Sequence, residues 1–207
     1  MNYCLKVGDK YAADDVNKLK QHIPDIMCLT DNPDGLTTDY MTLPDLPLYG
    51  VWWKMLMFNE RDFPEGRFFD LDIKIKKPID NLFKPKGKMT LLRTDWEDLE
   101  ELNKNTIGDR YKYCSINSSV MSWSGGNQHI WDDFIQDHEK IMSLFNGIDT
   151  YLEHRHLDNL SFFETGLVSS YRCDPNADVY IMSYDGEGKD GLYTNNEKVG
   201  DTVLGIH

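Results

Sequence analysis

The first thirty residues alternate between strand-like and helix-like hydrophobic patterns. Tyr3–Val7 is a short apolar run that ends at a Gly-Asp pair, which predicts a strand. Lys10–Ile23 carries apolar residues at helical spacing, and Pro24 follows it, which predicts a helix that ends there. Ile26–Leu29 predicts a second buried strand that runs into a turn rich in Asp, Asn, Pro and Gly. This strand–helix–strand unit predicts a right-handed crossover between parallel strands.

The rest of the chain continues the mixture of strands and helices. We expect a proline-containing loop, a short helix and a strand with two acidic residues over Leu43–Tyr49, Trp52–Phe58 and Phe68–Ile73. Further strands are predicted over Met89–Leu92, Tyr111–Trp123 and Asp178–Tyr184, and a solvated acidic segment over Asp95–Asn105. Helices are predicted over Ile130–Phe145 and Asn159–Glu164. The pattern predicts an α/β fold, with one domain over residues 1–207 and helices on both faces of a mostly parallel sheet.

Composition and charge narrow the class of protein. The chain has 207 residues, of which 40% are hydrophobic, so it is long enough to bury a core without disulfides. Its net charge of −13 excludes a general nucleic-acid-binding surface, but not a pocket for one nucleotide. We find no run long enough to cross a membrane and no apolar core of a secretory signal. The four cysteines lie far apart, which favours free thiols, and we expect a cytoplasmic protein.

The segment Arg67–Ile75 leads two aromatic residues into a pair of carboxylates, Asp70 and Asp72. In a strand, alternate side chains share a face, so both carboxylates would point the same way and Leu71 the other. Neighbouring carboxylates at the end of a buried strand repel each other unless a cation or hydrogen-bond donors neutralise them. Because Mg²⁺ and Mn²⁺ bind carboxylate oxygens together with substrate phosphates, the pair predicts a metal–diphosphate site. The competing interpretation is a solvated acidic pair, which an acidic chain contains by chance.

Other polar residues follow the predicted strands or lie within them, at Gly8–Tyr11, Thr30-Asp31 and Asn117–Ser119. In an open α/β sheet, ligands bind outside the carboxyl ends of the strands, so one pocket can gather these residues with the acidic pair. Gly8 would let the backbone approach a ligand closely, and Tyr11 would stack on a base. For Tyr11 alone, packing on the surface at a helix start is an equally good interpretation.

Six segments, in order along the chain, resemble the landmarks of a glycosyltransferase-like family of bacterial and phage type. That family is distantly similar to the glycogenin and lipopolysaccharide galactosyltransferase group. The resemblance covers roughly residues 4–186 and rests on Cys4–Tyr11, Cys28–Leu36, Trp52–Leu56, Phe68–Asp72, Ile116–Met121 and His156–Asn159. It implies a GT-A fold, which is a single Rossmann-like nucleotide-sugar-binding domain with a central mixed sheet.

The resemblance also implies how the donor is bound. Asp70 and Asp72 would hold Mn²⁺ or Mg²⁺ on the donor diphosphate, and Asp70 would also reach the ribose. Gly8, Tyr11 and Asp31 would surround the nucleoside.

The remaining roles that the resemblance implies concern phosphate, sugar and acceptor. Lys54 would lie near the phosphates, although a solvated helix lysine is an equally good interpretation of this residue. Asn117 and Ser118 would border the donor sugar. Asp158 would be the catalytic residue, contacting sugar hydroxyls or assisting the acceptor hydroxyl, and Asn159 beside it would help to bind the donor. For Asp158, an N-cap at the start of the following helix is an equally good interpretation.

The sequence departs from the family pattern at two places. Asn159 stands where relatives have Gln, and the last predicted strand is not followed by the His with which relatives complete the metal site. Asp185 or the terminal His207 would have to replace that ligand. The pair His154 and His156 has no other soft ligand nearby in the sequence, so we interpret it as a solvated turn rather than a zinc site.

The leading hypothesis is a metal-dependent glycosyltransferase, specifically a hexosyltransferase, which moves a sugar from a nucleotide-diphosphate sugar to an acceptor hydroxyl. The first alternative is a non-catalytic nucleotide-sugar-binding protein of the same fold, which the missing His keeps open. The second is a phosphotransferase with an Asp nucleophile, but such enzymes usually have Thr or Val where this chain has Lys74. The sequence leaves open the donor base, the sugar, the acceptor, the stereochemical outcome and the oligomeric state.

Overall fold

The computed structural model describes residues 1–95 and 115–184 of the chain. Its strands are β1 (Asn2–Lys6), β2 (Ile26–Thr30), β3 (Asp39–Thr42), β4 (Gly66–Phe69), β5 (Ile73–Ile75), β6 (Thr90–Arg93), β7 (Ile116–Trp123), β8 (Ser161–Phe162), β9 (Val168–Ser170) and β10 (Ile181–Ser183). Its helices are α1 (Ala13–His22), α3 (Gln128–Gln136), α4 (His138–Leu144), α5 (Ile148–His156) and the 3₁₀ helices η1 (Gly50–Phe58) and η2 (Leu157–Asn159). Within the described ranges, no helix has the length and apolar character that a membrane span requires.

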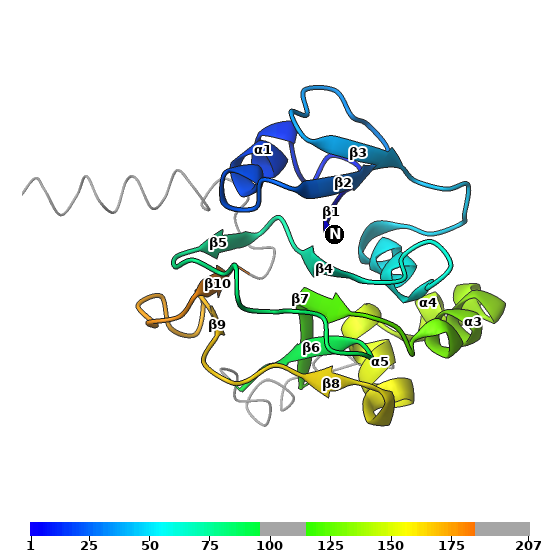
Figure 1. Cartoon of the computed structure of the whole chain (residues 1–207). Coiled ribbons are helices and arrows are strands. Elements are labelled where there is room, and N and C mark those ends of the chain that lie inside the picture. The colour runs from blue at the N-terminus through cyan, green and yellow to red at the C-terminus, as the bar shows by residue number, and fades with distance from the viewer. Residues whose placement is uncertain (96–114, 185–207) are drawn as a thin grey trace, which may run out of the picture.

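The central sheet has seven strands in the order β3-β2-β1-β4-β7-β6-β8 (Figure 1). Strand β1 pairs in parallel with β2 and β4, and the β2–β3 and β6–β8 pairs are also parallel. Only β7, among these strands, runs antiparallel to both of its neighbours. The predicted mostly parallel sheet, with the first two strands and the acidic-pair strand as neighbours, is therefore confirmed.

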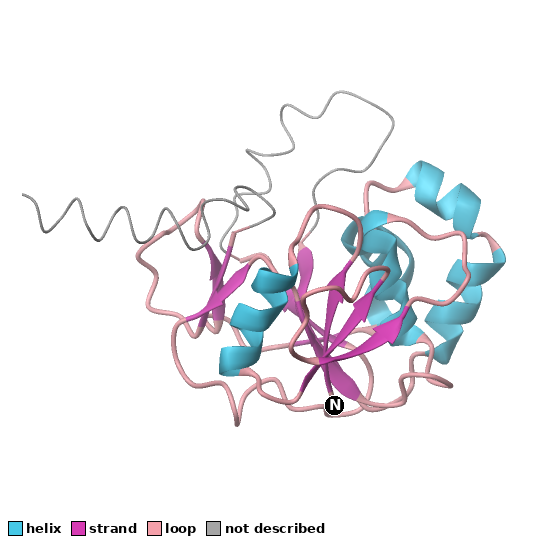
Figure 2. Cartoon of the chain, turned by 90° about the horizontal axis from the view of Figure 1, so that it is seen from above, coloured by secondary structure: helices cyan, strands magenta, loops and turns pink. Residues whose placement is uncertain are grey.

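Different elements cover the two faces of the central sheet (Figure 2). On one face, α1 packs with a second sheet of three strands in the order β5-β10-β9, and the shared core includes Val16, Phe69 and Ile181. The other face carries η1, α3, α4 and α5 over a larger core. Helices lie on both faces as predicted, but the small sheet was not foreseen.

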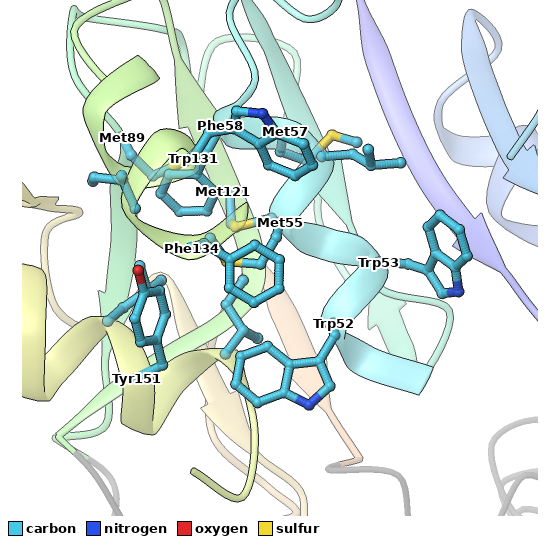
Figure 3. Close-up of a cluster of buried hydrophobic side chains, with 14 of the residues drawn as sticks. Trp52, Trp53, Met55, Met57, Phe58, Met89, Met121, Trp131, Phe134 and Tyr151 are labelled. Carbon is cyan, nitrogen blue, oxygen red and sulfur yellow. The ribbon is translucent and has the colours of Figure 1, made fainter. Parts of the chain in front are cut away.

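The core beneath η1 is rich in aromatic residues. Trp52 of η1 stacks on Phe134 of α3, with ring centroids 5.6 Å apart and an interplanar angle of 9°, and Tyr151 of α5 lies beside both (Figure 3). Every residue of η1 from Trp52 to Phe58 is buried, including Lys54. A helix that is apolar around its circumference belongs inside a protein, and η1 accordingly lies between the sheet and the outer helices.

The prediction of one strand over Phe68–Ile73, with the acidic pair inside it, is wrong. Strand β4 ends at Phe69, and β5 begins at Ile73 in the other sheet, so Asp70–Asp72 form the connection between the two sheets. The chain cannot continue as one strand through Asp70–Asp72, because β4 pairs with β1 and β7 in the central sheet whereas β5 pairs with β10 in the small sheet.

Two predicted helices also need correction. The helix predicted over Ile130–Phe145 is interrupted at Asp137, whose non-helical backbone separates α3 from α4. The helix predicted over Asn159–Glu164 is instead the end of η2 and strand β8, because the Ser161 amide bonds to the Met89 carbonyl on the sheet edge. Helix α5 and strands β3 and β9 were missed, and the predictions over 96–105 and 111–114 lie outside the described residues.

Gly66 allows β1, β4 and β7 to approach closely. A Cβ atom at this position would lie 2.7 Å from Tyr3 Cε2 and 2.9 Å from Trp123 Cζ2, both in buried rings. Gly66→Ala should therefore lower the free energy of unfolding by about 1–3 kcal/mol, measured by urea denaturation, because these rings must shift. Gly147→Ala is the control, since a Cβ there meets Val51 Cγ2 at an ordinary 3.5 Å. Equal stability of the two variants would show that Gly66 is not a packing constraint.

Candidate functional site

A cavity of about 350 Å³ opens at the carboxyl ends of β1 and β2. Three predicted nucleoside-binding residues, Gly8, Tyr11 and Asp31, line this cavity. The Gly8 amide donates a hydrogen bond of 2.8 Å to Asp31 Oδ2, and Gly8 has a φ of +61°, which favours glycine in this turn. The cavity lies where an open α/β sheet binds ligands, and its volume is within the range of small-molecule sites.

Tyr11 joins this cavity to the acidic pair. Its hydroxyl donates a hydrogen bond to Asp72. Burial, together with the carboxylates of Asp72 and Asp70, raises the pKa of Tyr11 above its ordinary value, so the hydroxyl stays protonated and remains a donor. Tyr11 therefore lines the cavity and also contacts the acidic pair, so the two lie next to each other.

Backbone hydrogen bonds hold both acidic residues in place. The Asp70 amide donates to the Ser119 carbonyl of β7 at 2.9 Å, and the Asp72 carbonyl accepts from the Tyr184 amide at 2.9 Å. The connection between the sheets is thus bonded at one end to β7 of the central sheet and at the other end to the residue that follows β10 of the small sheet. Asp185 and His207, the predicted substitutes for the missing His, lie outside the described residues.

Lys54 reaches the site from η1. Its Nζ atom is 2.6 Å from Asp70 Oδ2 and 3.3 Å from Ser118 Oγ. Burial alone would lower the pKa of Lys54, but the carboxylates of Asp70 and Asp149 raise it above its usual value, so the ammonium stays charged. The interpretation of Lys54 as a solvated helix lysine is wrong.

Asp149, in the first turn of α5, is a site residue that the sequence analysis missed. Its carboxylate hydrogen-bonds to Ser118. Burial raises the pKa of Asp149, with Lys54 and Ser118 acting in the opposite direction. Its Oδ1 atom is buried and has no hydrogen-bond partner in the described part of the chain. A single Asp at a helix start is common in any sequence, so no local signal distinguished this one.

The site carries more negative charge than its buried lysine can neutralise. Burial raises the pKa of Asp70 to about 7, although Lys54 opposes the shift and Asp72 adds to it. Asp72 Oδ1 is buried without a hydrogen-bond partner among the described residues. A group of carboxylates in this state favours a cation or a hydrogen-bonding ligand.

The donor set fits a hard divalent cation that shares its coordination with a ligand. Asp70 and Asp72 supply carboxylate oxygens, the ligand type that Mg²⁺ and Mn²⁺ prefer, and these ions usually need only one or two from the protein. Across residues 1–95 and 115–184, no three His, Cys, Asp or Glu side chains are arranged to hold a metal by themselves. The described residues therefore fit a cation only where a ligand or water supplies the rest of its coordination.

Two predicted residues lie away from the site. Asp158 and Asn159 come just before β8, which starts beside Thr90 of β6, and Thr90 pairs with Ser122 near the end of β7. The Asp158 carbonyl also accepts a hydrogen bond from Lys88, just before β6. Asp70, by contrast, bonds to Ser119, nearer the start of β7. Asp158 and Asn159 thus lie near the starts of β6 and β8, at the opposite end of the sheet strands from Asp70, and neither residue lines the cavity at Gly8.

The other predicted residues have clear positions. Ser118 is buried at the centre of the site, whereas the Asn117 Oδ1 atom accepts a hydrogen bond from the Ser119 amide. His156 is not in a solvated turn, because its Nε2 atom lies 2.9 Å from the Tyr151 hydroxyl and 3.1 Å from Asp133 Oδ2.

Solved structures resemble the chain over most of its length. A crystal structure of a glycosyltransferase involved in the glycosylation of the major capsid of PBCV-1 aligns with a TM-score of 0.55 and 11% identity, over 95% of this chain and 98% of that one. An active-site mutant of LgtC aligns with a TM-score of 0.56 and 10% identity, over 99% and 95%. The glycosyltransferase GlyE of Streptococcus pneumoniae TIGR4 aligns with a TM-score of 0.54 and 9% identity, over 88% of this chain but 54% of GlyE.

The chain has the GT-A fold of glycosyltransferases. No protein-family model and no curated protein sequence matches it. At the low identities above, the likeness shows the GT-A fold, and the chemistry has to be argued from the site itself.

The Lys54–Asp70 pair provides a test of the site's electrostatics. Lys54→Met should lower the free energy of unfolding by about 3–5 kcal/mol at pH 8, because it leaves buried carboxylates without their cation. Asp70 already has a folded-state pKa near 7, above its unfolded value, and losing Lys54 would raise it further. The folded variant would then bind extra protons as the pH falls, so the destabilisation should shrink between pH 8 and pH 5.

Two variants check this explanation by urea denaturation. Adding Asp70→Asn to Lys54→Met should recover part of the lost stability, since it removes one unpaired charge. Lys18→Met breaks an exposed pair with Asp14 and should cost no more than about 1 kcal/mol. A Lys54→Met protein as stable as Lys18→Met at pH 8 would contradict the buried ion pair.

Proposed function

We propose that this protein is a metal-dependent glycosyltransferase that moves a sugar, specifically a hexosyl group, from a nucleotide-diphosphate sugar to an acceptor hydroxyl. The observation that carries the proposal is the link that Tyr11 makes between a nucleoside-sized cavity and the Asp70–Asp72 pair on a GT-A fold. A nucleotide diphosphate needs both parts, one for its base and ribose and one for its phosphates.

The cavity would bind the nucleoside. Tyr11 offers a ring face for stacking, and the Gly8 turn leaves backbone accessible beside the ligand. Asp31 fixes this turn through the Gly8 amide, so it would shape the cavity as well as line it.

Asp70 and Asp72 would hold Mn²⁺ or Mg²⁺ together with the donor phosphates. When bound, such a cation stabilises the negative charge that develops on a departing diphosphate. The buried ammonium of Lys54 would hold Asp70 in position and add a fixed positive charge to the same region.

The donor sugar would lie toward Ser118 and Asp149. The Oδ1 atom of Asp149, which has no hydrogen-bond partner among the described residues, would accept a bond from a sugar hydroxyl, and Lys54 contacts the same Ser118 to which Asp149 bonds. We accordingly move the role that the sequence suggested for Asp158 to Asp149.

A thermal-shift panel tests donor binding. UDP-, GDP-, ADP-, CMP- and dTDP-linked sugars are compared with and without Mn²⁺, since a ligand that binds the native state raises Tm with occupancy. Release of the nucleoside diphosphate, or of CMP from a CMP-linked sugar, then tests turnover. A shift without turnover under any acceptor would favour a non-catalytic nucleotide-sugar-binding protein, and no shift with any donor would contradict the proposal.

Asp72→Asn should abolish most of the Mn²⁺-dependent part of the shift, with at least a tenfold loss of nucleotide affinity in Mn²⁺, because it removes a charged ligand. The metal-free variant should fold normally and gain slightly in Tm, since carboxylate repulsion falls. Asp158→Asn is the matched control, because Asp158 lies at the other end of the sheet strands from Asp72. Unchanged metal-dependent affinity in Asp72→Asn would remove the cation site from the proposal.

Asp149→Asn and Asp158→Asn together separate the two candidates for the sugar-contacting acid. Asp149→Asn keeps the shape but changes the charge and one acceptor, so we expect kcat to fall about 100-fold with donor binding largely retained. Asp158→Asn should keep wild-type turnover. Loss of turnover in Asp158→Asn alone would restore the original assignment.

A further inference from the structure

A second lysine, Lys10, stands on the solvent side of the acidic pair. Its Nζ atom lies 3.9 Å from Asp72 Oδ2 and 4.8 Å from the centroid of the Tyr11 ring. The Lys10 side chain is 52% exposed, whereas the Asp72 side chain is 10% exposed. Lys54, by contrast, is 9% exposed and 2.6 Å from its carboxylate. The two carboxylates therefore have different counter-ions, one locked in the core and one loosely held.

We propose that Lys10 is a replaceable counter-ion of Asp72, which opposes binding of a divalent cation when no nucleotide is bound and transfers to a donor phosphate when the nucleotide enters. The transfer to phosphate rests on the proposed function, whereas the competition with the cation does not. As a result, metal and nucleotide would bind cooperatively rather than independently.

The competition follows from charge and position. A divalent cation at Asp72 would bind within reach of the Lys10 ammonium, and like charges that share one carboxylate repel each other. Lys10 can leave at low cost, because its own side chain is half exposed, its contact with Asp72 is as long as 3.9 Å, and lysine is a flexible point charge. Asp72 Oδ1 is buried and has no hydrogen-bond partner in residues 1–95 and 115–184, so the carboxylate has an oxygen whose capacity as an acceptor is unused.

The chain also provides a destination for the displaced ammonium. Lys10 lies between Asp9 and Tyr11, and both of these residues line the nucleoside-sized cavity. The phosphates of a nucleotide in that cavity would lie toward Asp72, because Tyr11 connects the two. An ammonium released from Asp72 is therefore next to the anionic part of the ligand, where charge-assisted hydrogen bonds are favourable.

Binding of Mn²⁺ alone tests the competition. Electron paramagnetic resonance of free Mn²⁺ gives its dissociation constant for wild type, Lys10→Met and Lys18→Met. Lys10→Met should bind Mn²⁺ about three- to tenfold tighter than wild type, as removal of one nearby exposed charge implies. Lys18→Met changes the net charge of the protein by the same amount, but at a site on α1 where Lys18 pairs with Asp14. It should change the Mn²⁺ dissociation constant less than twofold.

Repeating the titration with UDP and with GDP tests the transfer to phosphate. In wild type, the nucleotide that binds should tighten Mn²⁺ binding, and this coupling factor should fall at least threefold in Lys10→Met because the variant has no counter-ion to transfer. A urea midpoint within error of that of wild type confirms that Lys10→Met is folded. If Lys10→Met is unstable, Lys10→Gln serves as a second uncharged replacement.

The outcomes separate this inference from the proposed function. Equal Mn²⁺ affinities for Lys10→Met and Lys18→Met, or absence of Mn²⁺ binding in all three proteins, would overturn the role of Lys10 even if sugar transfer is observed. Tighter Mn²⁺ binding by Lys10→Met with no donor bound or turned over would support the counter-ion and contradict the glycosyltransferase.

Discussion

The buried contact between Lys54 and Asp70 is the interaction on which the rest of the site depends. Lysine is seldom buried without a partner, and η1 brings Lys54 inside only because its neighbours Trp52 and Met55 are packed in the core. The ammonium meets Asp70 after β4 and Ser118 in β7, and Ser118 in turn bonds to Asp149 of α5. One charge thus ties the helical layer to the sheet and sets the positions of the residues around it.

The change of sheet between β4 and β5 supplies the second constraint. Because the chain leaves one sheet and enters the other within three residues, Asp70 and Asp72 occupy a short connection whose backbone is bonded at both ends. The short connection holds the two carboxylates close together, and their mutual repulsion costs free energy. Contacts with Lys54, Lys10 and Tyr11 offset part of that cost. Groups kept in such a state, with a pKa as displaced as that of Asp70, are typical of binding and catalytic sites.

Much of the fold and part of the site could be predicted from local patterns. Strands β1, β2 and β4 and their parallel arrangement followed from apolar runs and a helical crossover. Gly8, Tyr11 and Asp31 were expected at strand ends, and the structure collects them around one cavity. The errors lie where a segment pairs with distant partners: β8 forms on the edge of β6, and the small sheet combines strands from widely separated parts of the chain.

By itself the sequence determined the class of fold, the cavity residues and the acidic pair, because strand period, turn chemistry and short motifs are all properties of neighbouring residues. Only the tertiary structure decided that Lys54 is a buried ion-pair partner, that Asp149 belongs to the site and that Asp158 does not. Those three outcomes depend on strand order and helix packing, which bring together or separate residues far apart in the chain. A charged residue looks the same in a sequence whether it faces water or a buried partner, and burial alone distinguishes the two.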